Sequence, residues 1–453
     1  MKIANETPAF TRVTRREGLL SLLGGALFLA GCGGGGSGDN NQAALNSGST
    51  GSTGPTGPTT STDVNGSLSV GSIAGLGSII CNGVRFDDTD ATVVDEDEQP
   101  LPGGRDDLKL GMMCRVKGRG KSRKSDKTDK AEKIICNSEL LGPVDSIPAA
   151  TTAPTTMVVM GQKVKITVTT IFEEGLGLTG DKVLAVNDIV EVHGFVVDNE
   201  MTATRIQLKK AAEIKPTKMR GIVSALTATA TGSTFKIGEF TITVDASTDL
   251  GKLILKDGMV VRVKLTLTVP AVTTPPTKAT SGKAIKIREV EKEKETEEHE
   301  DVEIKGVITE FTSAANFVVN GVTIDASGVA ALPALKKGDR VEVVGRMKKG
   351  VLIAKSVKLE DENDRFKFVL FGRVTGSRTD GKLKFTFDIT TTGGSKLNKL
   401  TVDKDVNFTN SLHLADLRAD HGGTLIIEGV AEHDGSGSIR ATRIGLITLA
   451  ATS

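Results

Sequence analysis

The sequence is poorest in aromatic side chains. Its 453 residues include no Trp and no Tyr, and aromatic residues make up only 3% of the chain. Proteins that bind single-stranded nucleic acid stack bases on such side chains within a basic groove. The 57 basic and 56 acidic residues give a formal net charge of +1, so no overall field attracts a polyanion. The composition therefore argues against a nucleic-acid partner.

Histidine is also scarce, and no motif of a known catalytic type occurs. None of the histidines has a partner at the spacing of a zinc site or a catalytic triad. The sequence contains no Gly-x-Ser-x-Gly, no phosphate-binding loop and no His-Glu-x-x-His. We therefore predict no catalytic residue, no metal ligand and no cofactor. The histidines are His193, which falls at an outward strand position and is predicted to be exposed, and His299, His413, His421 and His433.

The N-terminus has the pattern of a secretory signal. Basic residues from Lys2 to Arg16 precede an apolar run, Leu19 to Leu29, that is shorter than the roughly 20 residues of a membrane-spanning helix. The run ends in Leu-Ala-Gly-Cys32, which resembles the lipobox of bacterial lipoproteins and implies a lipid on Cys32. A chance cysteine behind an ordinary cleavage site is the alternative. Gly33 in place of Asp favours the outer membrane, and Arg15-Arg16 leaves both Sec and twin-arginine export open.

The segment after Cys32 cannot fold by itself. It consists mostly of Gly, Ser, Thr, Asn and Pro, which bury too little apolar surface to form a core. We predict a signal peptide over residues 1–31 and a disordered tether over residues 32–65 that holds the remaining chain away from the membrane.

The stretch from Gly306 to Glu360 is the shortest clean copy of a recurring unit. It reads as five strands rich in β-branched residues, with an Asn320-Gly321 hairpin turn between the second and third. Alternation places Val341 and Val343 on the inward face of the fourth strand. Pro333 to Gly338 is predicted to form a helical turn before that strand. This order is that of a small OB-like barrel, whose closure removes sheet edges.

The same plan recurs along the chain, so we predict a mainly β protein of about five tandem OB-like barrels. Each unit begins near a Gly in its first strand, and most have a Gly after the fourth. The hairpin turn recurs at Asn82-Gly83, Gly161-Gln162 and Gly238-Glu239, and the fifth unit, the most divergent, has no clear hairpin dipeptide. The predicted units span residues 66–140, 141–213, 214–290, 304–360 and 366–449, with a charged linker at 291–303.

These turns and strands resemble DUF5666, a domain of unknown function found in tandem in bacterial envelope proteins. Leu76 to Ile79 with Asn82 to Phe86 looks like the opening of that domain. Asp188 to Gly194 followed by Ala203 to Ile206 looks like its close. The resemblance covers most of the chain after Gly66. It implies a fold, an envelope location and no catalytic residues.

Three charged stretches could serve as sites. Asp87 to Asp90 and Asp95 to Glu98 offer oxygen ligands for Ca²⁺, but they lack the Gly of a calcium loop, and a solvated acidic loop is the favoured interpretation. Glu289 to Glu303 alternates in charge and suggests a short exposed helix. A mobile basic loop could contact anionic polysaccharide or lipid phosphate, although a solubilising role is the default. Its cations are Arg119, Lys121, Arg123, Lys124, Lys127 and Lys130.

The cysteines after Cys32 all fall in the first unit. Cys81, Cys114 and Cys136 align with Val319, Val341 and Leu359, which are inward by alternation, so small apolar core residues are the simplest interpretation. An extracytoplasmic address permits disulfides, and strands four and five should pair as a hairpin. We therefore also predict a Cys114–Cys136 bridge, with Cys81 free and buried.

Three functions remain open from the sequence. The first is a non-enzymatic, lipid-anchored envelope protein that presents barrels for binding or scaffolding, with the membrane and an envelope protein as partners. The second is a binder of oligosaccharide or another envelope ligand. The third is an enzyme with an undetected site, which a cleft with converging polar groups would favour.

Overall fold

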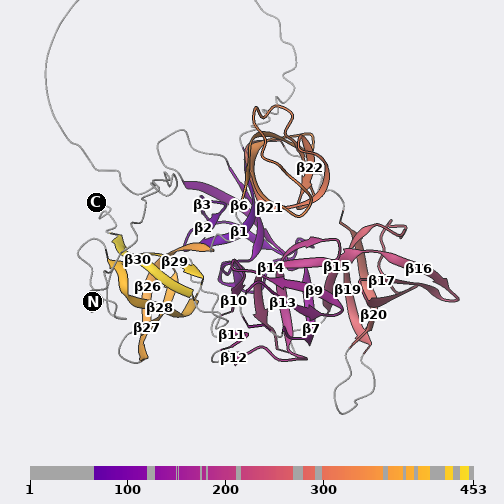
Figure 1. Cartoon of the computed structure of the whole chain (residues 1–453), viewed down its shortest axis with the longest axis horizontal. Coiled ribbons are helices and arrows are strands. Elements are labelled where there is room, and N and C mark those ends of the chain that lie inside the picture. The colour runs from indigo at the N-terminus through magenta and orange to yellow at the C-terminus, as the bar shows by residue number, and fades with distance from the viewer. Residues whose placement is uncertain are drawn as a thin grey trace, which may run out of the picture. The chain divides into compact units, whose positions relative to one another are not determined.

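Five closed barrels of five strands each make up the described part of the chain (Figure 1). The structure is a computed structural model. It describes residues 66–119, 128–148, 150–151, 153–173, 176–179, 182–210, 216–268, 279–290, 298–360, 366–380, 384–391, 396–408, 424–431 and 439–447. The predicted signal peptide, tether and lipidation site therefore lie outside the described residues. Within the described residues no helix has the length and hydrophobicity that a membrane crossing requires.

Barrels 1 and 2 carry small additions to the five-strand plan. Barrel 1 consists of β1 (Gly66–Leu76), β2 (Ile79–Cys81), β3 (Val84–Asp87), β5 (Met113–Gly118) and β6 (Thr128–Cys136), with β4 (Thr92–Val94) and the 3₁₀ turn η1 (Gly104–Asp107) between the third and fourth. Barrel 2 consists of β7 (Leu140–Ser146), β8 (Thr155–Val159), β9 (Gln162–Ile166), β13 (Ile189–Val197) and β14 (Glu200–Leu208), with β10 (Ile171–Phe172), β11 (Leu176–Gly177) and β12 (Lys182–Val183) in the corresponding place.

The other three barrels follow the plan more simply. Barrel 3 has a divided first strand, β15 (Thr217–Ile222) and β16 (Ser224–Thr229), then β17 (Gly232–Ile237), β18 (Phe240–Asp245), β19 (Val260–Thr268) and β20 (Ser281–Glu289). Barrel 4 consists of β21 (His299–Ser313), β22 (Asn316–Val319), β23 (Val322–Asp325), β24 (Arg340–Lys348) and β25 (Val351–Leu359). Barrel 5 consists of β26 (Lys367–Asp380), β27 (Lys384–Thr391), β28 (Lys396–Phe408), β29 (Thr424–Ala431) and β30 (Ile439–Ile447).

All five barrels close in the same order. The first strand pairs with the second and the fourth, the second with the third, and the fourth with the fifth, while the third and fifth run parallel. Barrel 4 shows the ring in Figure 1, where β21 to β25 are seen nearly end-on. The predicted inward residues Val341 and Val343 are fully buried. The OB-like fold class is confirmed.

The hairpin turns follow the chemistry of their central residues. Asn82-Gly83 and Asn320-Gly321 both have positive φ at both positions, as a type I′ turn requires. Gly238 has the positive φ expected at the first position of its turn. In barrel 2 the turn lies one residue earlier than predicted, at Met160-Gly161, because Val159 pairs with Gln162.

One predicted helical segment is wrong, and another is not helical where the structure describes it. Pro333 to Gly338 forms an irregular loop closed by a turn in which Asp339 N–H donates to the Lys336 carbonyl. So short a helix would be marginal, and Leu335 instead packs against the barrel core. The described end of the charged linker, from His299, is strand rather than helix, because it pairs with both β24 and β1.

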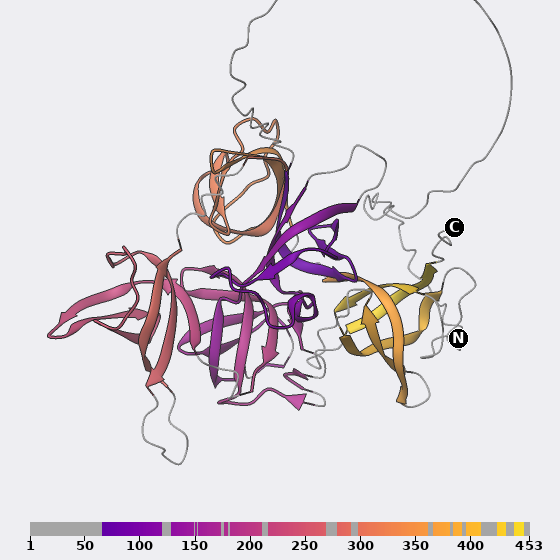
Figure 2. The ribbon, with the colours of Figure 1, turned by 180° about the vertical axis from the view of Figure 1, so that it is seen from behind.

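Strand pairing joins neighbouring barrels, although the closure of each barrel was expected to remove its sheet edges. The first half of β1 pairs in parallel with β21, and its second half pairs in parallel with β26. These parallel pairings join barrels 1, 4 and 5 in one network (Figure 2). A single antiparallel pair, Lys218 with Leu141, joins barrels 2 and 3 in another. Each half of the first strand is bonded on only one edge within its own barrel, so the opposite edge remains open to a neighbour.

Candidate functional site

A regular array of cations lies on the outward face of barrel 3. Lys218, Lys264 and Lys286 occupy one row across β15, β19 and β20, since Lys218 is in register with Lys264 and Lys264 with Lys286. A second row is formed two residues away on each strand. We call the two rows the basic ladder, which comprises Lys218, Arg220, Arg262, Lys264, Lys286 and Arg288.

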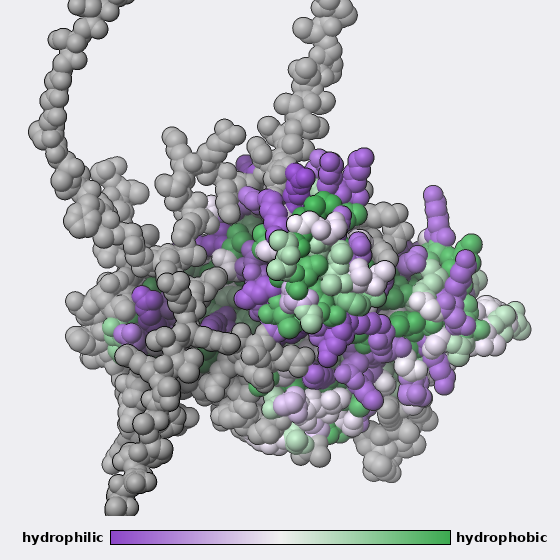
Figure 3. Space-filling view, turned by 45° about the horizontal axis from the view of Figure 1, so that its top comes forward, coloured by the Kyte–Doolittle hydropathy of each residue, from purple (hydrophilic) through white to green (hydrophobic). Residues whose placement is uncertain are grey.

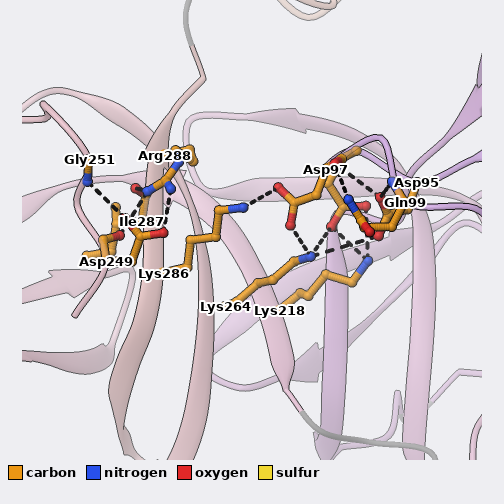
Figure 4. Close-up of polar contacts among 11 residues, drawn as sticks. Asp95, Asp97, Gln99, Lys218, Asp249, Gly251, Lys264, Lys286, Ile287 and Arg288 are labelled. Carbon is orange, nitrogen blue, oxygen red and sulfur yellow. Dashed lines mark hydrogen bonds and ion pairs between the residues drawn. The ribbon is translucent and has the colours of Figure 1, made fainter. Parts of the chain in front are cut away.

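The acidic loop of barrel 1 lies on the lysine row (Figure 4). Glu96 accepts from Lys218 at 3.0 Å and lies 3.4 Å from Lys264, and Asp97 pairs with Lys264 and, at 2.8 Å, with Lys286. We call Asp95–Glu98 the acidic tongue. The Glu96 side chain is only 3% exposed. The predicted solvated loop is therefore wrong for Glu96, because the ladder supplies the cations that replace water.

The local backbone shapes the tongue for this contact. The Asp95 carboxylate accepts from the N–H groups of Asp97 and Gln99, and Gln99 O accepts from Asp95 N–H. These bonds make a tight turn from which Asp97 points toward the lysines (Figure 4). Glu96, in the same turn, pairs with Lys218. Among the described residues, no group of three or more His, Cys, Asp or Glu side chains could hold a metal ion. The calcium alternative thus finds no assembled ligand set there.

We call the contact between the acidic tongue and the basic ladder the charged seam. Its cations lower the pKa values of its carboxyl groups. Burial alone would raise the pKa of Asp97, but the hydrogen bonds from Lys264 and Lys286 outweigh it and lower the pKa to about 2. Burial opposes ionisation of Glu96 as well, and attraction to Lys218 lowers its pKa below the usual value. Both groups are therefore ionised at neutral pH.

The linker between barrels 1 and 2 supplies the anion for the arginine row. Glu139 is buried, lies 3.0 Å from Arg220 and 3.7 Å from Arg262, and belongs to neither barrel's closing strands. Burial raises its pKa, but the two guanidinium groups outweigh this effect, so the net pKa is lowered. At the outer end of the row, Arg288 pairs with Asp249 of its own barrel at 2.6 Å. Every cation of the two rows is thus paired with a carboxylate of this chain.

His193 is buried, with 3% of its surface exposed, so the predicted surface histidine is wrong. It does point outward from β13, but the linker covers it, and its Nδ1 donates to the Asn137 carbonyl at 2.8 Å. Burial lowers the pKa of His193 to about 4 despite the neighbouring Glu191. Its Nε2 has no hydrogen-bond partner among the described residues. A neutral ring enclosed in this way is a packing element of the seam.

The other outward polar residues of barrel 2 also bond beyond their own strand. Arg205 is buried in β14, donates to Gln207, and reaches the Leu110 carbonyl of barrel 1 at 3.0 Å. Gln207 donates in turn to Glu191, which pairs with Lys209 at 2.9 Å. Glu191 continues the lysine row, since it is in register with Leu141 and Leu141 with Lys218. The seam therefore crosses barrels 1, 2 and 3.

The cysteines lie where the sequence places them. Cys114 and Cys136 are directly opposite on β5 and β6, with Cα atoms 4.2 Å apart, and are joined by a disulfide. Cys81 is free and buried, and burial raises its pKa to about 12, which keeps the thiol protonated and unreactive. Leu359, the residue aligned with Cys136, was expected to be inward but is 45% exposed. The alternation that places Cys136 inward therefore does not extend to the end of β25.

The predicted basic loop lies mostly outside the described residues. At its two ends, Arg119 pairs with Glu132 at 2.7 Å and Lys130 with Asp90 at 2.6 Å. His299 is buried in β21 beside Gly66, and His413, His421, His433 and Cys32 lie outside the described residues. Sequence reasoning did not identify the ladder. The only local signal for it was alternation of single cations on three strands.

The comparisons agree with the repeated fold. The family model for a domain of unknown function (DUF5666) matches the chain over residues 142–207, 220–271 and 305–358. These regions fall on barrels 2, 3 and 4, which is consistent with tandem repeats of this domain. No curated protein matches the chain by sequence.

Proposed function

We propose that this protein is a non-enzymatic, lipid-anchored scaffold of the bacterial cell envelope. The proposal rests on the ion pairs between barrels. The acidic tongue of barrel 1 and the linker residue Glu139 both pair with the basic ladder of barrel 3. Side chains arranged in this way hold domains together rather than converge on a reacting group. The three regions that match DUF5666 support a scaffold role, because the chain repeats a fold without repeating any catalytic residues.

In this proposal the anchor is a lipid on Cys32, at the lipobox-like sequence Leu29 to Cys32, and the location is the outer membrane. A lipid of this kind attaches a folded protein without spanning the bilayer. Mass spectrometry of the mature N-terminus should find an acylated Cys32, and Cys32→Ala should move the protein to the soluble fraction. Cys81→Ala, which removes a core cysteine instead, should remain with the membrane. An unmodified N-terminus, or Cys32→Ala that stays membrane-bound, contradicts the anchor.

The scaffold role requires partners in the envelope. A pull-down from detergent-solubilised envelope with the anchored chain should recover an envelope protein at a fixed ratio. The same partner should be lost with a chain whose barrels 1 and 3 are uncoupled by Glu96→Lys with Asp97→Lys. Recovery of equal amounts with both chains would contradict a role for the assembled barrels.

A second candidate is binding of an acidic envelope oligosaccharide, which the ladder itself supports. Six cations in two rows suit a polymer with repeated negative groups. Because the tongue occupies the lysine row, such a ligand would compete with it. Glu96→Gln with Asp97→Asn should then bind dextran sulfate more tightly than the unaltered chain does. Equal binding by both chains would eliminate this candidate.

A further inference from the structure

Barrel 3 presents an open sheet edge. Its first strand is interrupted at Val223, and the second part, β16, pairs only with β17 and ends the path of its sheet. Most of Ser224–Thr229 is exposed. In Figures 1 and 2 the two strands project from the barrel as an arm. An edge of this kind offers unpaired backbone groups to another strand.

The register shows which backbone groups are open. The two-residue turn Ala230-Thr231 connects Thr229 with Gly232. The pair that flanks such a turn, here Thr229 with Gly232, is a hydrogen-bonded pair. Bonded and non-bonded pairs alternate in an antiparallel ladder, so Thr227 is bonded to β17 and Ala228 faces the other way. Leu226 N–H is already taken by Asp257 at 3.0 Å. The backbone N–H and C=O groups that remain open on this edge are therefore centred on Ala228.

The edge lacks the protection that native edge strands usually have. From Ile222 to Phe235 the sequence contains no charged residue and no proline, and the bulge at Ser224 precedes the open part. In Figure 3 the end of the arm, at the right of the view, is pale and green rather than purple. The corresponding edge of barrel 1, at Gly75 and Leu76, is covered by β26, and that of barrel 4 carries the exposed Glu310.

We propose that β16 pairs with β16 of a second copy of this chain, antiparallel about a two-fold axis at Ala228. In this arrangement each Ala228 N–H donates to the other Ala228 carbonyl, and each Ala230 N–H donates to the other Leu226 carbonyl. A second copy is the occupant we infer, because first strands of this chain already pair edge to edge. They pair in parallel in β1–β21 and β1–β26, and antiparallel at one position in β7–β15. Because residues 222–235 carry no charge, the paired strands place no like charges opposite each other, and the threonines suit cross-strand contact. The Asp257 carboxylate lies at the Leu226 end of the edge, away from the central Ala228 pair.

Sedimentation velocity of the full chain with Cys32→Ala tests the proposal. A dimer should form with rising concentration up to roughly 100 μM, since an interface below about 1,200 Å² is weak. Ala228→Lys should raise the dimer dissociation constant by at least about tenfold, because two lysines would face each other across the axis. Ala246→Lys, an exposed alanine in a loop of the same barrel, should leave it unchanged. A chain that is monomeric throughout, or equal effects of the two lysines, overturns the proposal.

A cysteine at the axis gives a second readout that does not depend on the strength of association. Residues opposite each other in a bonded antiparallel pair have Cα atoms about 5.5 Å apart, which a disulfide spans. Ala228→Cys should therefore form a disulfide-linked dimer under mild oxidation, and Ala246→Cys should not. Absence of the linked dimer for Ala228→Cys would contradict the two-fold pairing, as would its appearance for both variants.

Discussion

The glycine that recurs in each first strand is explained by the residue packed over it. In barrel 1 a Cβ on Gly71 would lie 2.1 Å from Asn82 Oδ1, and in barrel 4 a Cβ on Gly306 would lie 2.0 Å from Asn320 Nδ2. The asparagine of the turn therefore fits only because the residue beneath it has no side chain. It lies flat on the first strand and bonds its backbone: Asn82 donates to the Val70 carbonyl at 2.8 Å.

We predict that Gly306→Ala destabilises barrel 4 by about 1–3 kcal/mol, the cost of leaving buried polar groups unsatisfied. The new methyl group would displace Asn320, which accepts from Val307 N–H and donates to the Lys305 carbonyl. Gly328→Ala is the control, since its Cβ would meet nothing within 4 Å. Urea unfolding followed by hydrogen exchange in barrel 4 measures both. Equal stability of the two variants would refute this account of the glycine.

His193 makes the protein sensitive to mild acid. Its folded pKa, about 4, is below the unfolded value near 6.5, so only the unfolded chain takes up the proton between these pH values. The contribution of the neutral His193 to the free energy of unfolding is therefore complete above pH 6.5 and is lost as the pH falls toward 4. Between pH 7 and pH 5 it should decrease by about 2 kcal/mol. The carboxyl groups of the seam, with lowered pKa values, lose their contribution only at lower pH.

An NMR titration of the imidazole signals measures this directly. One histidine, absent from the spectrum of His193→Gln, should titrate near pH 4. The same variant should have lost most of the stability change between pH 7 and pH 5. A pKa of 6 or higher for His193 would mean that water reaches the ring and that the linker does not cover it.

At the scale of elements, a bulge recurs in the middle of the fourth strand of barrels 2, 3 and 4. The register shifts after His193 in barrel 2 and after Val344 in barrel 4, where a Cβ on Gly194 or Gly345 would lie 2.1 or 2.2 Å from a carbonyl oxygen of the facing strand. Barrel 3 has the bulge without this glycine. There the space is provided by Gly282 on the fifth strand, beside the Leu265 side chain.

The sequence was informative wherever the signal is local. Asn320-Gly321 specifies its turn because both residues accept positive φ, and β-branched alternation specifies the strands. Met160 shows the limit of such reasoning. It adopts φ +44° although methionine has no preference for it, and its side chain packs over Gly142 as Asn82 packs over Gly71. Tertiary packing, which local pattern cannot report, shifted that turn by one residue.

The candidate site was missed because its residues are distant in the sequence. Lys218, Lys264 and Lys286 each look like an ordinary solvated residue in an alternating strand, and only the sheet register aligns them. Asp95 to Glu98 looked solvated because composition does not show which surface a loop contacts. His193 looked exposed for the same reason: the alternation was right, but the covering linker is a tertiary feature.

The tongue should depend on its lysines for order. Lys264 contacts both Glu96 and Asp97, so Lys264→Gln should speed hydrogen exchange of the Asp97 and Gln99 amides, which bond within the tongue. Added salt should produce a smaller change of the same kind. Lys252→Gln, an exposed lysine of the same barrel, should have no effect. Unchanged exchange in Lys264→Gln would show that the turn orders itself without the ladder.

At the scale of the whole molecule, the structure is a set of like barrels joined in two ways. First-strand edges join barrels 1, 4 and 5, and the charged seam joins barrels 1, 2 and 3. Barrel 1 takes part in both, and it alone carries a disulfide among the described residues. The seam is the part of this arrangement that depends on specific side chains, so the proposed scaffold role rests on it most directly.

Zero-length carbodiimide crosslinking, which joins a carboxylate to an amine already in contact, tests the seam most directly. On the full chain at low ionic strength it should link the peptide containing Glu96 and Asp97 to those containing Lys218, Lys264 or Lys286. Lys283 and Asp245, 2.8 Å apart within barrel 3, serve as the internal control. If that control link forms while no link joins the tongue to the ladder, barrels 1 and 3 do not meet through this seam and the central claim is wrong.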